Sequence, residues 1–213
     1  KRQIAPWVRS AHLYGATVKW AEADLASGAL PAWQFTSLVS PSTAIVALPA
    51  AHALVGVVTD VEAISSSVHR ISPRAWTIVD ATDVLPYRHV EIQSWGADVV
   101  ALDLAPLGGP ELGALVFRDE AMFDRLRPPR RRGWSSASSV SSSALGVSAG
   151  QGRGRHAGAG VVEWDPPQAA LCGSVAALVD HWAGLDDSAT GTRRRRLQST
   201  MPKIDTYLPA LAA

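Results

Sequence analysis

Apolar and polar residues alternate in two different periods between residues 4 and 117. Apolar positions three and four residues apart predict helices over residues 4–14, 30–39 and 59–70, with Thr59 or Asp60 capping the third. Short apolar runs predict strands over residues 17–21, 44–48, 76–79, 98–102 and 114–117. The run over 44–48 is apolar throughout, which is typical of a parallel strand buried on both faces.

This order of strands and helices predicts an α/β fold, a three-layer sandwich around a mostly parallel sheet with right-handed crossovers. Ligands of such sheets bind outside the carboxyl ends of the strands. Asp80 and Asp103 directly follow two of the predicted strands, so a site is to be sought there first. Helical spacing returns over residues 168–184 and 187–208.

Residues 127–160 follow neither period. They are rich in Arg, Ser and Gly and contain no acidic residue. The segment is interpreted as a flexible RNA-binding arm, as a linker, or as the product of a shifted reading frame in GC-rich DNA. The last two are favoured because the pattern resumes afterwards. We therefore divide the chain into an α/β portion (1–126), a disordered low-complexity segment (127–160) and C-terminal helices (161–213).

Charge and composition exclude several classes of protein. Twenty basic and 19 acidic residues leave a net charge of +1, so neither nucleic acid nor a membrane surface is expected as a partner. No apolar run reaches the roughly 20 residues of a spanning helix, and no signal peptide opens the chain. Cys172, the single cysteine, is expected to be a packed structural thiol. A reducing, cytoplasmic location fits this pattern.

Several further side chains have both a functional and a structural interpretation. His52 follows a predicted strand and is either a ring-stacking or acid–base group or a solvated loop residue; His69, at a helix end, is expected at the surface. Residues 193–196 are four arginines, for which a solvated helix face is favoured over phosphate binding. No set of residues has metal-ligand spacing. Four of the eight tryptophans are expected to pack in the core or in a dimer: Trp7, Trp20, Trp76 and Trp95.

Residues 6–117 resemble the class V aminotransferases, fold-type I enzymes that use pyridoxal phosphate and include the cysteine desulfurases, and most closely an actinobacterial cysteine-desulfurase-like branch. The segment QIAPW, residues 3–7, is similar to the family's Asn-x-x-Pro-Trp. The segment WTIVDATDVLPYRHVEIQSWGADVVALDLAPLGGPELGALVFRD resembles the family's strand with Val-Asp, its Ser-Gly-His-Lys loop and its Gly-Pro. HWAGLDDSATGTRRRRL is similar to the start of the family's long connecting helix. The resemblance implies a portion of the large domain and a dimeric enzyme acting on amino acids.

The resemblance also assigns the cofactor positions residue by residue. Asp80 matches the aspartate that pairs with the pyridine nitrogen and keeps it protonated. Asp83 stands where cysteine desulfurases have a glutamine, and Ala53 stands where they have an asparagine. Glu163 lies in the place of an Arg-x-Glu segment without the arginine.

The family's Ser-Gly-His-Lys loop corresponds to residues 103–106. Asp103 takes the place of the serine, Ala105 that of the histidine and Pro106 that of the Schiff-base lysine. Proline has no side-chain amine, and an aspartate repels a phosphate dianion. Only three lysines exist, Lys1, Lys19 and Lys203, and none lies near this loop in sequence. We therefore expect no internal aldimine, although the resemblance implies pyridoxal 5'-phosphate as cofactor.

Three hypotheses remain open for the function. The chain is a desulfurase-like or aminotransferase-like protein that has lost its lysine chemistry, a non-catalytic partner that dimerises with an intact paralogue, or a truncated and frameshifted remnant. The absence of an initial methionine suggests a fragment, with the family's first phosphate-binding turn upstream and its small domain downstream.

Overall fold

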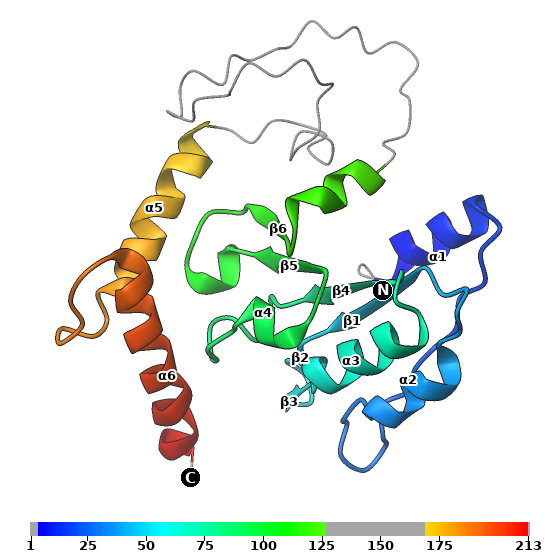
Figure 1. Cartoon of the computed structure of the whole chain (residues 1–213). Helices are drawn as coiled ribbons and strands as arrows, with labels where there is room; N and C mark the ends of the chain where they lie inside the picture. The colour runs from blue at the N-terminus through cyan, green and yellow to red at the C-terminus, as the bar shows by residue number, and fades with distance from the viewer. Residues whose placement is uncertain (1–3, 127–168, 213) are drawn as a thin grey trace, which may run out of the picture. The chain divides into compact units, whose positions relative to one another are not determined.

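A mixed four-stranded sheet lies at the centre of the larger of two compact units in the computed structural model (Figure 1), which describes residues 4–126 and 169–212. The larger unit comprises Lys1–Arg118 and Gln168–Ala213, and the smaller comprises Asp119–Pro167. In the smaller unit the structure describes a 3-10 helix, η2 (Glu120–Arg125), in which the Asp119 side chain accepts a hydrogen bond from the Ala121 N–H. The predicted low-complexity segment 127–160 and Glu163 lie outside the described residues.

The sheet has the strand order β1–β4–β5–β6. Strands β1 (Ile45–Pro49), β4 (Trp76–Asp80) and β5 (Val99–Asp103) run parallel, and β6 (Gly113–Phe117) returns antiparallel to β5. The connection between β1 and β4 contains the helix α3 (Val61–Ile71), and that between β4 and β5 contains the single turn α4 (Ile92–Trp95). The predicted α/β class with a mostly parallel sheet is confirmed.

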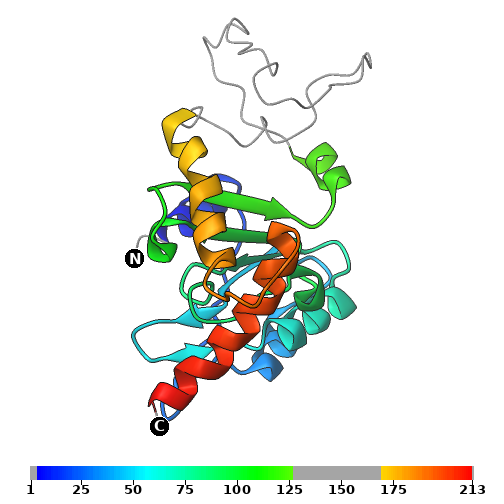
Figure 2. The same cartoon turned by 90° about the vertical axis from the view of Figure 1, so that its left-hand side faces the viewer.

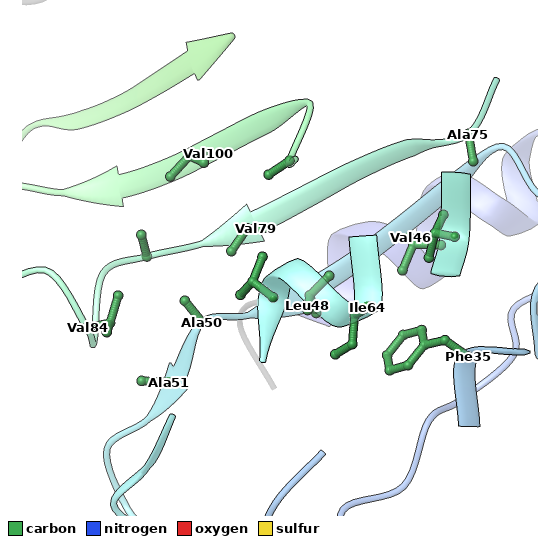
Figure 3. Packing of buried hydrophobic residues seen from close by; sticks show 14 of the residues in the cluster. Phe35, Val46, Leu48, Ala50, Ala51, Ile64, Ala75, Val79, Val84 and Val100 are labelled. Atoms are coloured by element: carbon green, nitrogen blue, oxygen red, sulfur yellow. The ribbon is translucent and has the colours of Figure 1, made fainter. Parts of the chain in front are cut away.

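Helix α3 supplies most of the helical side of the core. Its apolar residues Val61, Ile64 and Val68 recur at three- and four-residue spacing and are 2% exposed or less. Of the two cap candidates, Asp60 caps the helix by accepting a hydrogen bond from the Ala63 N–H at 3.0 Å. Figure 3 shows Ile64 beside Leu48 of β1, within the buried cluster that also contains residues of β4 and β5.

Strand β1 is buried on one face only, in contrast to the expectation from its continuous apolar run. Val46 and Leu48 belong to the core, whereas Ile45 on the opposite face is 49% exposed. Ala47 on the same face is also exposed, so no layer of the described residues covers this face of β1. On that opposite face, Trp76 of β4 and Phe117 of β6 form an edge-to-face aromatic pair, with their ring centroids 6.4 Å apart. Strand β5 lies between these two strands.

The expected strand over residues 17–21 is wrong, because these residues form no ladder. Directly after this segment, a side chain of the helix α2 (Ala32–Leu38) binds the backbone of Glu22: the Gln34 amide accepts from the Glu22 N–H at 2.9 Å and donates to the Glu22 carbonyl at 2.7 Å. An antiparallel pair that the pattern did not predict, β2 (Ala51–His52) with β3 (Val57–Val58), follows β1. Both are too short to show a period.

The predicted N-terminal and C-terminal helices are present as α1 (Ala5–Leu13), α5 (Ala169–Ala183) and α6 (Arg193–Ala212), the last two packed against each other (Figure 2). One expectation about packing is wrong. Cys172 on α5 is exposed, because the buried side of this helix carries Leu178 and Ala183 instead. Trp7 and Trp20 are 40% and 54% exposed, while Trp95 packs against the core. No helix within residues 4–126 or 169–212 combines the length and hydropathy needed to cross a membrane.

Candidate functional site

The carboxyl ends of β4 and β5 bring together two of the aspartates selected from the sequence. Asp80 ends β4, and its Oδ1 accepts a hydrogen bond from the Thr82 N–H at 3.0 Å. The Thr82 hydroxyl oxygen in turn accepts from the backbone N–H of Asp103, at the end of β5, at 3.2 Å. Thr82 therefore links the two aspartates, and sequence analysis missed it, because a threonine at a turn carries no distinctive signal.

The other predicted site residues lie on the connections around this edge. Asp83 is exposed in the turn after β4, and Ala105 and Pro106 are exposed in the 3-10 helix η1 (Ala105–Leu107) after β5. His52 is exposed at the end of β2, with Ala53 directly after it. Ala50, directly before β2, is joined to this edge by a hydrogen bond from its N–H to the Asp80 carbonyl at 2.8 Å. Asp80 itself is half-buried.

The side chains at this edge offer few hydrogen-bond donors or positive charges to a phosphate-bearing ring. Asp80 is a carboxylate of the kind that holds a protonated ring nitrogen. The loop after β5, however, offers a carboxylate, a methyl group and a proline ring at Asp103, Ala105 and Pro106. Two unit charges of like sign 4 Å apart repel by about 1 kcal/mol even in bulk water. The residues present therefore do not fit pyridoxal phosphate, and we derive no catalytic step through it.

Both lysines among the described residues are bound elsewhere. The Lys19 ammonium donates to the Leu38 carbonyl at 3.0 Å, at the end of α2. The Lys203 ammonium donates to Asp186 at 2.6 Å and to the Ser188 hydroxyl at 3.0 Å, at the connection between α5 and α6. Neither contact involves the loop after β5.

A second polar cluster, which sequence analysis missed, lies where β4 and β5 begin. Asp98 is 4% exposed, and its Oδ2 accepts from the Thr77 N–H at 2.8 Å and lies 2.8 Å from His69 Nε2. Its Oδ1 lies 2.7 Å from the Arg118 guanidinium. His69 is thus held by an ion pair or hydrogen bond, and its side chain is 25% exposed, which is less than the surface position predicted for it. This end of the sheet is opposite to the predicted ligand edge, so the cluster joins strands and α3.

The four arginines at the start of α6 divide into two kinds. Arg193 forms a bidentate pair with Asp180 of α5 at 2.6 and 2.7 Å, and Arg196 reaches the same carboxylate at 3.7 Å. The hydrogen bonds from Arg193 lower the pKa of Asp180 below its ordinary value. Arg194 and Arg195 are exposed, in agreement with a partly solvated helix face. Within the described ranges, no three His, Cys, Asp or Glu residues are arranged to hold a metal ion.

A parallel-sheet scaffold with candidate chemistry at its carboxyl edge is the class of fold on which pyridoxal-phosphate transferases are built. The family model described as aminotransferase class-V matches residues 2–179. The chain belongs to this family, as the sequence motifs indicated.

Relatives in other organisms agree with this assignment. The chain is 39% identical over 205 residues to "Uncharacterized protein MT3887" of Mycobacterium tuberculosis (strain CDC 1551 / Oshkosh), an alignment that covers 96% of this chain and 46% of that protein. It is 26% identical over 125 residues to a "Probable cysteine desulfurase" of Mycoplasma pneumoniae, which covers 59% of this chain and 30% of the relative. The chain thus spans less than half the length of these relatives.

Solved structures show the same fold. The structure described as the apo form of a cysteine desulfurase from Thermococcus onnurineus NA1 superposes with a TM-score of 0.53 at 26% identity, over 62% of this chain and 32% of that one. A structure named "NIFS-LIKE PROTEIN" superposes with a TM-score of 0.51 at 20% identity, over 55% of this chain and 32% of that one. The α/β fold is therefore that of cysteine-desulfurase-like proteins.

Proposed function

We propose that this chain is a cysteine-desulfurase-like member of the class-V aminotransferases that has kept the scaffold and lost its lysine-dependent chemistry. The observation that carries this proposal is Pro106, which stands where the resemblance expects the Schiff-base lysine. The proline nitrogen is part of an amide and cannot condense with an aldehyde. The contacts of Lys19 and Lys203 with other partners support the proposal, because neither amine is offered to the β5 loop. A cytoplasmic location, which the single cysteine favours, is part of the same proposal.

A pyridoxal-phosphate titration of the full chain tests the proposal. Absorbance is followed in the aldimine band, the sample is reduced with borohydride, and the digested protein is mapped by mass spectrometry. We expect no saturable band and no adduct confined to one residue. Variants Lys19→Arg and Lys203→Arg serve as controls, because scattered labelling of surface lysines falls when each is removed. A saturable band whose reduced adduct maps to a single lysine contradicts the proposal.

A second candidate function, that of a dimerisation partner, is favoured by the apolar side chains exposed near the N-terminus. Leu13 and Tyr14 after α1 are 76% and 77% exposed, and Trp33 of α2 is 70% exposed. Where exposed apolar side chains gather into one patch on a folded protein, the patch marks an interaction site. We propose that these side chains are covered by a second copy of the chain or by a class-V paralogue.

Light scattering coupled to size exclusion tests the dimer. We expect the mass of two chains for the wild type and a shift toward one chain for Trp33→Ala, because the substitution removes apolar contact area. Tyr207→Ala is the matched control, since Tyr207 is similarly exposed, at 62%, but lies on α6. A monomeric wild type that also gains no mass when mixed with an intact class-V enzyme rules this function out.

A further inference from the structure

The loop of residues 103–109, which follows the end of β5, has no backbone donor left for a ligand. Six residues from Asp103 to Gly109 carry an N–H, and each of these donates within the chain. The Asp103 N–H binds the Thr82 hydroxyl, the Leu104 N–H binds the Leu112 carbonyl, and the Ala105 N–H binds the Asp103 carboxylate. Pro106 has no N–H at all.

The remaining donors of the loop close the 3-10 turn. The N–H groups of Leu107 and Gly109 both donate to the Leu104 carbonyl, at 3.1 and 3.0 Å, and the Gly108 N–H donates to the Ala105 carbonyl at 2.9 Å. Gly108 completes the turn in the left-handed region, with φ of 80°. A phosphate site is built from backbone N–H groups that point outward or from cationic side chains. This loop presents neither, and it adds a carboxylate.

The same loop is in close contact with α5. The indole Nε1 of Trp182 donates to the Leu107 carbonyl at 2.9 Å. Leu178, one turn earlier on α5, is 8% exposed and packs against Gly109. A Cβ atom built on Gly109 would lie 2.6 Å from Leu178 Cδ2 and 2.9 Å from the Leu104 carbonyl oxygen. The glycine therefore gives the loop the room that its own turn needs beside the Leu104 carbonyl and leaves the space that the Leu178 side chain fills.

We propose that the loop 103–109 takes no phosphate-bearing ligand, covalently or otherwise, and that it serves instead as the seat on which α5 is fixed. This inference deepens the proposed function, on which it rests for the identity of the site. The proposed function excludes only the Schiff base. Because the backbone N–H groups of residues 103–109 are all bound within the chain, the loop also lacks the donors for non-covalent phosphate binding. The contacts of Trp182 and Leu178 indicate instead that the loop fixes α5.

Calorimetric titration of the full chain tests the first half of the inference, with pyridoxal phosphate, pyridoxal and inorganic phosphate as probes. We expect no saturable heat that depends on the phosphate group, because every backbone donor of residues 103–109 is already bound within the chain. Saturable, phosphate-dependent binding to the wild type without a reducible adduct overturns the inference and leaves the proposed function intact. A reducible adduct on the wild type overturns the proposed function.

Hydrogen exchange of the amides in α5 tests the second half. We expect Gly109→Ala to speed this exchange by about tenfold or more, because the added methyl group displaces the helix from its seat. Gly113→Ala is the matched control, since the nearest atom to its Cβ is the Leu102 carbonyl oxygen at an ordinary 3.7 Å. Trp182→Phe keeps the ring and removes only the indole donor, so it speeds exchange less. Unchanged exchange in both Gly109→Ala and Trp182→Phe overturns the inference.

Discussion

Asp98 joins three segments of the larger unit through one carboxylate. It lies at the start of β5, binds the Thr77 N–H of β4, and contacts His69 of α3 and Arg118 after β6. A carboxylate that is 4% exposed loses most of its hydration and depends on such partners. Its role is structural, because the cluster lies at the opposite end of the strands from the candidate site.

We predict that Asp98→Ala lowers the free energy of unfolding by about 1–3 kcal/mol, the range for leaving a buried polar group without its hydrogen-bond partner, because the Arg118 side chain is 45% exposed and can be solvated. The substitution leaves the Thr77 N–H without its acceptor and Arg118 without its counter-charge. Urea unfolding followed by tryptophan fluorescence measures the change. Asp83→Asn is the control, because Asp83 is exposed; equal stability of the two variants would show that the Asp98 cluster is not stabilising.

Single residues also show where sequence reasoning succeeds. Asp80 and Asp103 were placed at the ligand edge because strand ends can be read from apolar runs. Thr82 and the pairing of His69 with Asp98 were not found, because they depend on contacts across 21 and 29 residues of sequence. Such contacts follow from the register between strands, which no local pattern contains.

At the scale of elements, the junction between α5 and α6 is fixed by charge. Asp186 in the connection accepts from the Lys203 ammonium at 2.6 Å and from the hydroxyls of Ser188 and Ser199. The hydrogen bond from Lys203, followed by that from Ser188, lowers the pKa of Asp186 far below its ordinary value of 3.8. The ionised carboxylate is therefore favoured in the folded state.

This lowered pKa predicts an acid-sensitive junction. A carboxyl group with a depressed folded pKa contributes its full stabilisation above the unfolded pKa, near 3.8, and loses it as the pH falls toward the folded value. We expect the stability difference between wild type and Asp186→Asn to be constant at neutral pH and to shrink below pH 3.8. Thermal unfolding at a series of pH values measures it. A difference that does not change with pH contradicts the assignment.

Elements were predicted well where their own residues fix them. The helix α3 has both a cap at Asp60 and an apolar stripe, and these features are local. The strand expected over residues 17–21 is absent because no neighbouring strand pairs with it, and such pairing depends on the tertiary structure and not on the segment's own residues. The exposure of Cys172 was missed for a similar reason, since the buried side of α5 is chosen by the loop it contacts.

At the scale of the whole molecule, the chain carries a family scaffold over less than half the length of the relatives described above. The sheet buries the face that contacts α3, while the outer face of β1 stays partly exposed. Scaffold and chemistry are thus separable here. The packing of a parallel sheet needs apolar volume alone, whereas the cofactor chemistry of the family needs particular side chains at a few loop positions.

The sequence by itself determined the α/β class, the family, and the residue types at the candidate site, including a proline where the resemblance expects a lysine. Each of these follows from local periodicity or from motif spacing. The tertiary structure alone decided that Thr82 links the ends of β4 and β5 and that His69 is paired with Asp98. It also decided that the N–H groups of the 103–109 loop donate within the chain and that the loop contacts α5. The physical reason is that hydrogen-bond partners and close packing are set by register and helix docking, which join residues far apart in the chain.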